Sequence, residues 1–263
     1  MDTGPQEHAS LTYSSYLALE DVLAAQHPRS DEHDEMLFIV IHQVYELWFK
    51  QLLHELAYLQ RRLEAGDSAH SLRTLDRVLS VLKVVVAQID VLETMLPSRF
   101  AGFRSRLEAA SGFQSAQFRE LEAVLGRRDE RAFRHYPVGG AARERIEAAM
   151  SRPSLYDSFL AYLRVHGYPV PRRPDVRRPP EPDPRVQDVL LKVYTDDGAP
   201  ASVCERLVDL DEGLQEWRYR HVKMVERTIG DKSGTGGSSG AGYLRTTLFA
   251  PMFPDLWEVR KQL

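Results

Sequence analysis

Apolar residues recur every three or four positions along most of this 263-residue chain, which is the spacing of one face of an α-helix. The long stretches of this kind are 34–64, 72–96 and about 201–229, and shorter ones cover about 114–126, 139–150, 154–166 and 184–196. No run alternates with period two between turn residues, so strands are not expected. Long helices joined in this way pack as a bundle. The sequence therefore predicts an all-α helical bundle.

Local signals mark boundaries within the helical pattern. Ser154 is followed by Asp157 three residues later, which is typical of a capping box at a helix start. Pro97 is expected to end the second long helix, because proline cannot continue one. The segment 169–184 contains seven prolines, which favours an extended surface connection. We expect one all-helical domain over residues 1–263, with 169–184 joining two helical parts of it.

Composition excludes several classes of protein. A net charge of −4 and the lack of a long basic run argue against nucleic-acid binding. No apolar run approaches 18 residues, so no membrane span is expected. The first 16 residues lack the pattern of a signal peptide. The lone Cys204 permits no internal disulfide and fits a reducing compartment. These features together predict a soluble, cytoplasmic protein.

His221 is the first candidate for chemistry. It shares one helix face with Leu214 and Trp217, so its imidazole should point into the interior. Six glycines follow between Gly230 and Gly242, and glycine lets a backbone approach a ligand closely. A core histidine followed by a flexible linker would show the same pattern. The pairing of imidazole and loop favours a cofactor with a polar substrate beside it.

Two further residues support a cofactor pocket. His42 lies in the middle of the most apolar helix, where a core histidine is the alternative reading. A zinc site built on two histidines would normally need a third protein ligand, and HExxH does not occur. Haem b needs one proximal imidazole, an apolar pocket and a distal face, so it is the better candidate. Arg104 follows Phe100 and Phe103, and a guanidinium there could bind a carboxylate, although most arginines are simply solvated.

Four separated segments carry a family resemblance: 33–56, 100–119, 217–230 and 233–245. In this order they resemble the tryptophan 2,3-dioxygenase family, and the similarity extends from residue 11 to residue 260. The resemblance implies an oxidoreductase of tryptophan catabolism, in the kynurenine pathway. With haem iron and O₂, such an enzyme opens the indole C2–C3 bond of L-tryptophan to give N-formylkynurenine.

The resemblance also implies roles for residues around the haem and the indole. By similarity, His221 is the proximal iron ligand and His42 is the distal catalytic histidine that faces the indole nitrogen. Phe38 matches an aromatic residue that packs on the indole. Phe100 matches a second wall of the substrate pocket, at a position where some family members carry tyrosine. Any contact made by that hydroxyl is lost here.

The amino-acid end of the substrate is assigned in the same way. By similarity, Arg104 clamps the substrate carboxylate and Thr235 helps to hold the ammonium and carboxylate groups. Ser111 and Gly112 match a short segment beside the haem.

The N-terminal segment 1–16 resembles one that reaches the active site of a neighbouring subunit. Tyr13 and Tyr16 match the tyrosines involved, which implies an obligate homo-oligomer, a homotetramer in the family pattern. Two alternatives stay open from the sequence. One is a haem monooxygenase that turns a substituted tryptophan into an oxindole in a biosynthetic pathway, and the other is a non-catalytic helical scaffold.

Overall fold

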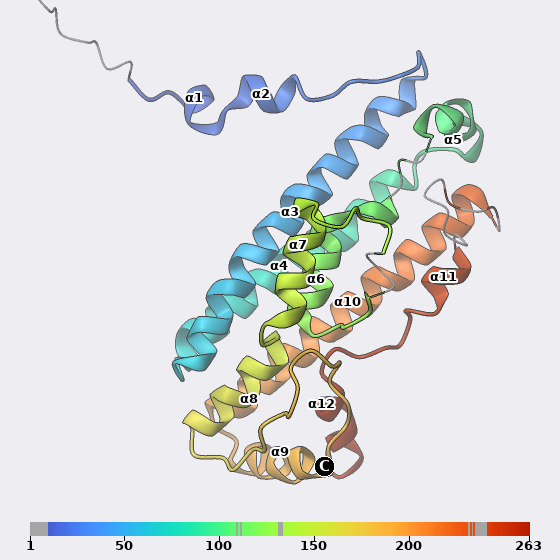
Figure 1. The fold of residues 1–263 in the computed structure, drawn as a ribbon. Coiled ribbons are helices and arrows are strands. Elements are labelled where there is room, and N and C mark those ends of the chain that lie inside the picture. The colour runs from blue at the N-terminus through green and yellow to red at the C-terminus, as the bar shows by residue number, and fades with distance from the viewer. Residues whose placement is uncertain are drawn as a thin grey trace, which may run out of the picture.

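The computed structural model describes residues 10–108, 110, 112–130, 134–230, 232, 234 and 241–263. Every regular element within these ranges is a helix (Figure 1), which confirms the predicted all-α class. No helix in the same ranges is long and apolar enough to cross a membrane.

Three long helices form the body of the molecule and lie lengthwise beside one another (Figure 1). They are α3 (His33–Glu64), α4 (Ser68–Leu92) and α10 (Ala199–Ile229). Each buries an apolar stripe, and the main core forms where the stripes meet. α10 packs against α4 at Gly213, where a Cβ would lie 2.7 Å from a methyl carbon of Leu82. The absence of a side chain at Gly213 therefore permits this packing.

Shorter helices cover α3 and close the ends of the bundle. They are α5 (Pro97–Arg104), α6 (Ala116–Leu125), α7 (Ala141–Ser151), α8 (Leu155–Val165), α9 (Pro184–Asp196), α11 (Ala241–Arg245) and α12 (Pro254–Glu258), with single 3₁₀ turns η1 (Ser105–Leu107), η2 (Gly112–Gln114) and η4 (Val259–Lys261). The predicted start of α8 is confirmed. The backbone N–H of Asp157 donates to the Ser154 hydroxyl, and the Asp157 carboxylate accepts from the Ser154 N–H at 2.8 Å.

The second long helix ends earlier than the sequence pattern predicted. α4 stops at Leu92, and the hydroxyl of Thr94 donates to the carbonyl of Val91 at 2.7 Å just beyond it. Pro97 then begins α5 at its first position, with Leu96 as the residue before the helix. Proline is favoured there, because its missing N–H would have no helical partner and its φ already suits the first turn. The prediction that Leu96 belongs to the second helix was wrong.

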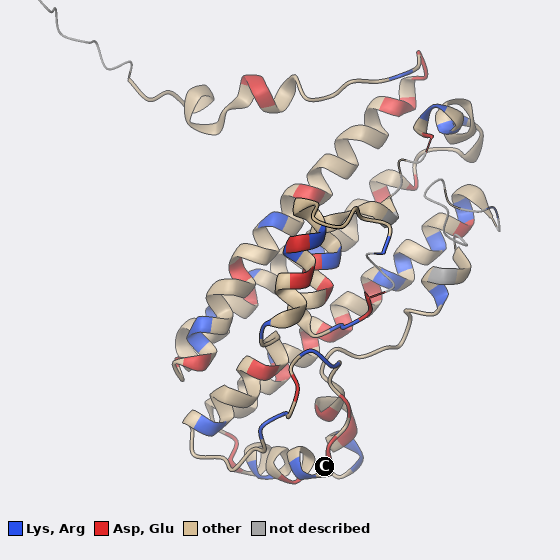
Figure 2. Cartoon of the chain, in the orientation of Figure 1, with Lys and Arg blue, Asp and Glu red and all other residues tan. Residues whose placement is uncertain are grey.

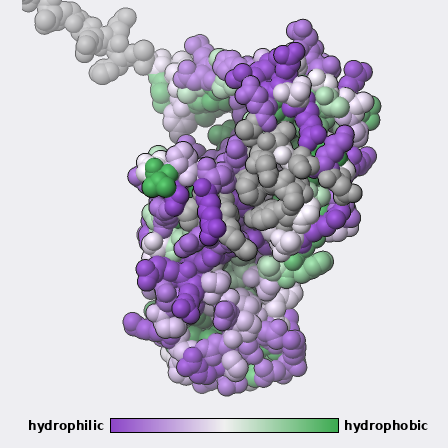
Figure 3. All heavy atoms as spheres, turned by 45° about the vertical axis from the view of Figure 1, so that its right-hand side comes forward, coloured by the Kyte–Doolittle hydropathy of each residue, from purple (hydrophilic) through white to green (hydrophobic). Residues whose placement is uncertain are grey.

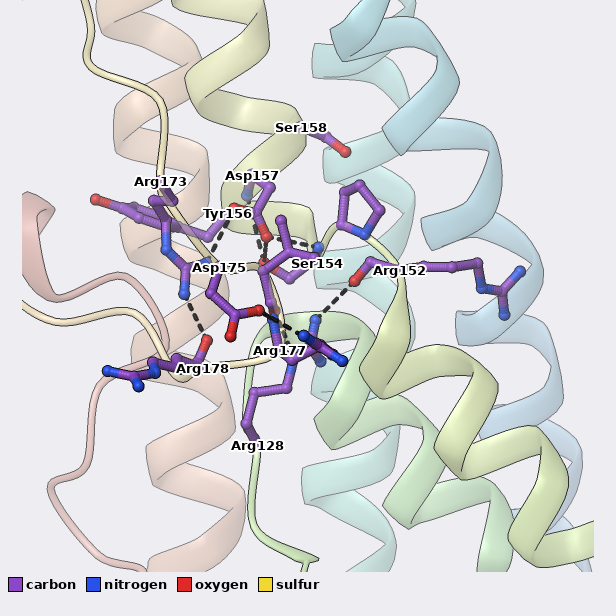
Figure 4. Close-up of polar contacts among 12 residues, drawn as sticks. Arg128, Arg152, Ser154, Tyr156, Asp157, Ser158, Arg173, Asp175, Arg177 and Arg178 are labelled. Carbon is purple, nitrogen blue, oxygen red and sulfur yellow. Dashed lines mark hydrogen bonds and ion pairs between the residues drawn. The ribbon is translucent and has the colours of Figure 1, made fainter.

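The proline-rich segment is held to the bundle by charged side chains (Figure 4). A guanidinium nitrogen of Arg173 lies 2.9 Å from the carboxylate of Asp157, at the start of α8. Nε of Arg128, which follows α6, donates to the carbonyl of Val176 at 3.0 Å. Residues 169–183 therefore cross the surface in a fixed path without forming a helix of their own.

A buried carboxylate on α10 fixes the C-terminal segment. Asp211 is fully buried and accepts hydrogen bonds from the backbone N–H groups of Met252 at 2.9 Å and Phe253 at 3.1 Å. It also accepts a hydrogen bond from the indole Nε1 of Trp257 at 2.9 Å. These three donors all belong to residues 252–257, so the carboxylate holds that segment against the helix that carries His221.

The N-terminal part of the described chain runs away from the bundle (Figure 1). Residues 10–24, which we call the arm, contain two short helices, α1 (Tyr13–Leu17) and α2 (Leu19–Leu23), and neither has a buried residue. Residues 25–32, the arm root, lead into α3. The C-terminus lies at the opposite end of the bundle from the arm (Figure 1).

Candidate active site

One large cavity lies between α3, α5, α6 and α10, and its lining is mostly apolar. Its volume is about 220 Å³ when measured to the centres of the water molecules that would fit inside it. A single water needs roughly 10–15 Å³ by this measure. The cavity therefore has room for a sizeable organic group instead of a few trapped waters.

Both candidate histidines line this cavity, His42 from α3 and His221 from α10. Nδ1 of His42 lies 2.7 Å from the carbonyl oxygen of Phe38. Since a carbonyl can only accept, Nδ1 carries the proton, and Nε2 of the neutral ring remains an acceptor. Burial lowers the pKa of His42, and the bond to Phe38 and the carboxylate of Glu46 offset this only in part. His42 is thus a neutral hydrogen-bond acceptor at neutral pH.

His221 has the properties of an available ligand. Its ring stacks on Trp217 one turn earlier, with centroids 5.2 Å apart and planes 6° from parallel. No described residue forms a hydrogen bond with its imidazole. Burial, then the nearby His42 and Arg119, lower the pKa of His221 to about 4, so the ring is neutral. A neutral imidazole with uncommitted nitrogens can ligate a metal ion.

The other ligand types for a metal are not grouped with His221. Among the described residues, no three side chains of His, Cys, Asp and Glu cluster in a way that could hold a metal ion. A structural or catalytic zinc site would need such a group. One imidazole beside an apolar cavity instead matches the axial ligation of haem.

Aromatic side chains form one wall of the cavity. The Phe38 ring lies 5.7 Å from that of Phe100 and 5.6 Å from that of Phe103, centroid to centroid. The Phe38 ring also lies 4.1 Å from the His42 ring. The three phenylalanine rings pack with Ile41 and other side chains in a second, smaller core where α3 meets α5. Such a wall suits a flat aromatic ligand.

The remaining predicted site residues fall into three groups. Arg104, half-buried at the end of α5, and Gly112 in η2 both line the cavity. Tyr13 and Tyr16 lie on the arm, with 76% and 72% of their surface exposed, and are not part of the cavity of their own chain. The predictions for Ser111 and Thr235 lie outside the described residues.

A buried charge cluster in the cavity wall was not anticipated from the sequence. Glu122 accepts from Arg119 at 2.6 Å, and from Arg218 and Arg127 at 3.3 Å each. At most 6% of the side chain is exposed for Glu122, Arg119 and Arg218. Burial raises the pKa of Glu122, but the three guanidiniums outweigh this and hold it below its ordinary value. Asp129 also lies 4.0 Å from Arg127, so the described part of the cluster has three guanidiniums and two carboxylates.

The position of Arg218 in this cluster could have been predicted from the sequence. Arg218 follows Leu214 by four residues and precedes His221 by three, so it lies on the buried face of α10. A charged residue on an apolar face needs a buried partner. Its partner, Glu122, is 96 residues away, and the sequence does not identify it.

Comparison with known proteins gives consistent results along the whole chain. A family model described as tryptophan 2,3-dioxygenase matches residues 2–159 and 185–263. A protein of that name from Anaeromyxobacter sp. (strain K) is 66% identical, over 99% of this chain and 100% of its own length. The protein of that name from Herpetosiphon aurantiacus is 54% identical over 97% of this chain and 99% of its own length. The one from Caulobacter vibrioides is 42% identical over 96% of this chain and 98% of its own length.

Proposed function

The chain belongs to the tryptophan 2,3-dioxygenase family, and we propose that its reaction takes place in the cavity between α3 and α10. The reaction is the oxidative cleavage of the indole C2–C3 bond of L-tryptophan by O₂, which yields N-formylkynurenine. The observation that carries the assignment to this cavity is the pair of neutral histidines on its walls, His42 and His221.

Haem b fits the residues that line the cavity. His221 would bind the iron through a ring nitrogen that no described residue engages. Haem b carries two carboxylates, and the guanidiniums of Arg119 and Arg218 in the cavity lining support a place for at least one of them there. Gly112 has open space where a Cβ would be, so its backbone can approach a flat group. When bound, the haem iron supplies the oxygen chemistry.

The protein's own contribution is to orient tryptophan. Nε2 of His42 accepts the indole N–H, because its Nδ1 proton is held by the carbonyl of Phe38. The rings of Phe38 and Phe100 form the wall that the indole packs against. Arg104 binds the substrate carboxylate, with Thr235 of the glycine-rich loop assigned to the ammonium group by family resemblance. Fixing both ends of the substrate sets the position of the C2–C3 bond, which lowers the entropic part of the barrier.

The arm supports assembly into a homo-oligomer. Tyr13 and Tyr16 are exposed, and α1 contains no charged side chain (Figure 2). We assign these tyrosines to the cavity of a neighbouring copy in a homotetramer, where their apolar surface would be covered. The chain is assigned to the cytoplasm, in keeping with its single cysteine.

The test is the mass of the product. Purified, haem-loaded protein is reduced without oxygen and then given L-tryptophan and ¹⁸O₂, while the Soret band and product mass are followed. We expect both labelled atoms in N-formylkynurenine. One labelled atom would identify a monooxygenase, turnover only with a substituted tryptophan would change the substrate, and the lack of a Soret band would refute the haem site. The His221→Ala variant serves as the control for reactions of unbound haem.

A further inference from the structure

The arm carries apolar surface but leaves the bundle at a fixed point. Leu11 and Leu23 are 75% and 73% exposed, in addition to the two tyrosines. Apolar atoms are visible next to the grey N-terminal trace in Figure 3. Between the arm and α3, the arm root makes a set of hydrogen bonds to residues that the reaction does not use.

Gln43 is the first of these residues and directly follows His42 on α3. Its Nε2 donates to the carbonyl of Ala25 at 2.9 Å, and its Oε1 accepts from Nε2 of Gln26 at 2.6 Å. One side-chain amide thus binds both the backbone and a side chain where the arm meets the root. These bonds hold Ala25 and Gln26, which follow α2, against the helix that carries His42.

Glu35 is the second residue and lies in the first turn of α3, with 2% of its surface exposed. Its carboxylate accepts from the backbone N–H groups of Arg29 at 2.9 Å and Ser30 at 2.8 Å, and from the Ser30 hydroxyl at 2.5 Å. Three donors on one buried carboxylate fix the path of the root. The chain therefore enters α3 in one direction.

A third contact ties the root to the helix that carries the carboxylate clamp. The side chain of Glu32 lies over Gly102 of α5, where a Cβ would come within 2.7 Å of its carboxylate oxygen. Gly102 is two residues from Arg104. The root is thus held by α3 and α5, the two helices that carry His42, Phe38, Phe100 and Arg104.

We propose that Gln43 and Glu35 are positioning residues that aim the arm of one subunit at the substrate cavity of a neighbouring copy. This inference rests on the proposed role of the arm. An arm without buried residues of its own loses conformational freedom when it docks. Anchoring its root removes part of that cost before docking, so the partner's cavity is completed more often. The effect acts in trans, on the neighbour's tryptophan affinity.

The first experiment compares Gln43→Leu and Glu35→Gln with matched controls on the same helix. Gln51→Leu removes a glutamine whose partner, Glu55, is also held by Arg77. Asp34→Asn removes the same first-turn charge as Glu35→Gln without touching the root. We expect Gln43→Leu and Glu35→Gln to keep full haem content. Each should raise the KM for L-tryptophan at least fivefold, with a smaller change in kcat. The controls should stay within twofold of the unmodified protein.

Limited proteolysis gives a readout that a general loss of stability would not reproduce. Chymotrypsin cleaves after exposed tyrosines, so Tyr13 and Tyr16 should be protected while the arm is docked in the assembly. We expect cleavage at these sites to be at least tenfold faster in Gln43→Leu than in Gln51→Leu, with the rest of the chain intact. Equal cleavage rates would overturn the proposal.

Mixed assemblies test whether the effect acts in trans. Gln43→Leu subunits are co-expressed with Arg104→Leu subunits, whose cavities bind tryptophan poorly but whose arms are unaltered. We expect the KM of the mixture to return toward that of the unmodified protein. A KM that stays high would mean that Gln43 acts on its own cavity, which refutes the inference.

A deletion of residues 1–24 separates this inference from the proposal it rests on. An unchanged KM after deletion would refute the role of the arm in a neighbouring site, and the inference with it. A raised KM after deletion, together with an unchanged KM for Gln43→Leu and Glu35→Gln, would refute the positioning role alone.

Discussion

Replacing Glu122 with Gln removes a carboxylate that contacts all three guanidiniums of the buried cluster. The change preserves the shape of the side chain but removes the negative charge that both Arg119 and Arg218 contact, where almost no solvent reaches them. Breaking a buried ion pair from one side costs about 3–5 kcal/mol, because a buried charge then lacks compensation. We expect the free energy of unfolding to fall by about that amount.

The assay is thermal unfolding at matched protein concentration, with and without haem. For a chain of this size, about 3–5 kcal/mol corresponds to a fall in Tm of roughly 6–20 °C. The fall should be smaller in the haem-loaded protein, since a haem carboxylate would compensate part of the positive charge. Glu120→Gln on the same helix is the control, because its pair with the half-exposed Arg145 is worth only about 0–1 kcal/mol. A Glu122→Gln shift no larger than that of the control would refute the reasoning.

The same cluster predicts a dependence on pH. The pKa of Glu122 in the folded protein lies below its ordinary value. Its contribution to stability is therefore complete above the unfolded value of about 4.3 and is lost as the pH falls through the lower, folded value. The difference in Tm between the unmodified protein and Glu122→Gln should accordingly be constant near neutrality and shrink below about pH 4. A difference that grows on acidification would contradict this sign.

Four more substitutions test the site and its support. His221→Ala should abolish the Soret band of the purified protein, and normal haem binding would exclude it as the ligand. Arg104→Leu should weaken kcat/KM for L-tryptophan by about 2–5 kcal/mol, mostly through KM, in steady-state assays, if the carboxylate is left buried and unpaired. His42→Ala should slow turnover while the Soret band is retained, and loss of haem would reverse the proximal and distal assignments. Asp211→Asn should lower stability by about 2–4 kcal/mol in denaturant titrations, because three donors lose a charged acceptor.

The long helices and one cap could be predicted because their signals are local. The apolar spacing of residues 34–64 and 201–229 reports directly on which face is buried, and both helices are found within two residues of the expected ends. Ser154 and Asp157 interact three residues apart, so their pattern is visible in the chain itself. The end of α4 was misjudged because a leucine at 96 fits the apolar spacing equally well before a helix start.

The parts that sequence could not supply depend on distant partners. Arg119 and Glu122, spaced by three, look like an ordinary surface pair on a helix. Only the fold shows that both are buried and that Arg218, 96 residues after Glu122, pairs with it. The same holds for Gln43, since a glutamine on a long helix has no pattern that predicts its bonds to Ala25 and Gln26.

The arm and the C-terminus lie at opposite ends of the bundle, and this affects how the protein should be handled. An affinity tag or surface linker fused before residue 1 would add its mass to the segment that we assign to a neighbour's cavity. The same tag placed after Leu263, which is 61% exposed, would lie at the opposite end of the bundle from the arm. Purification, immobilisation and fluorescent labelling should therefore use the C-terminal end, and an N-terminal fusion should be removed before kinetics are measured.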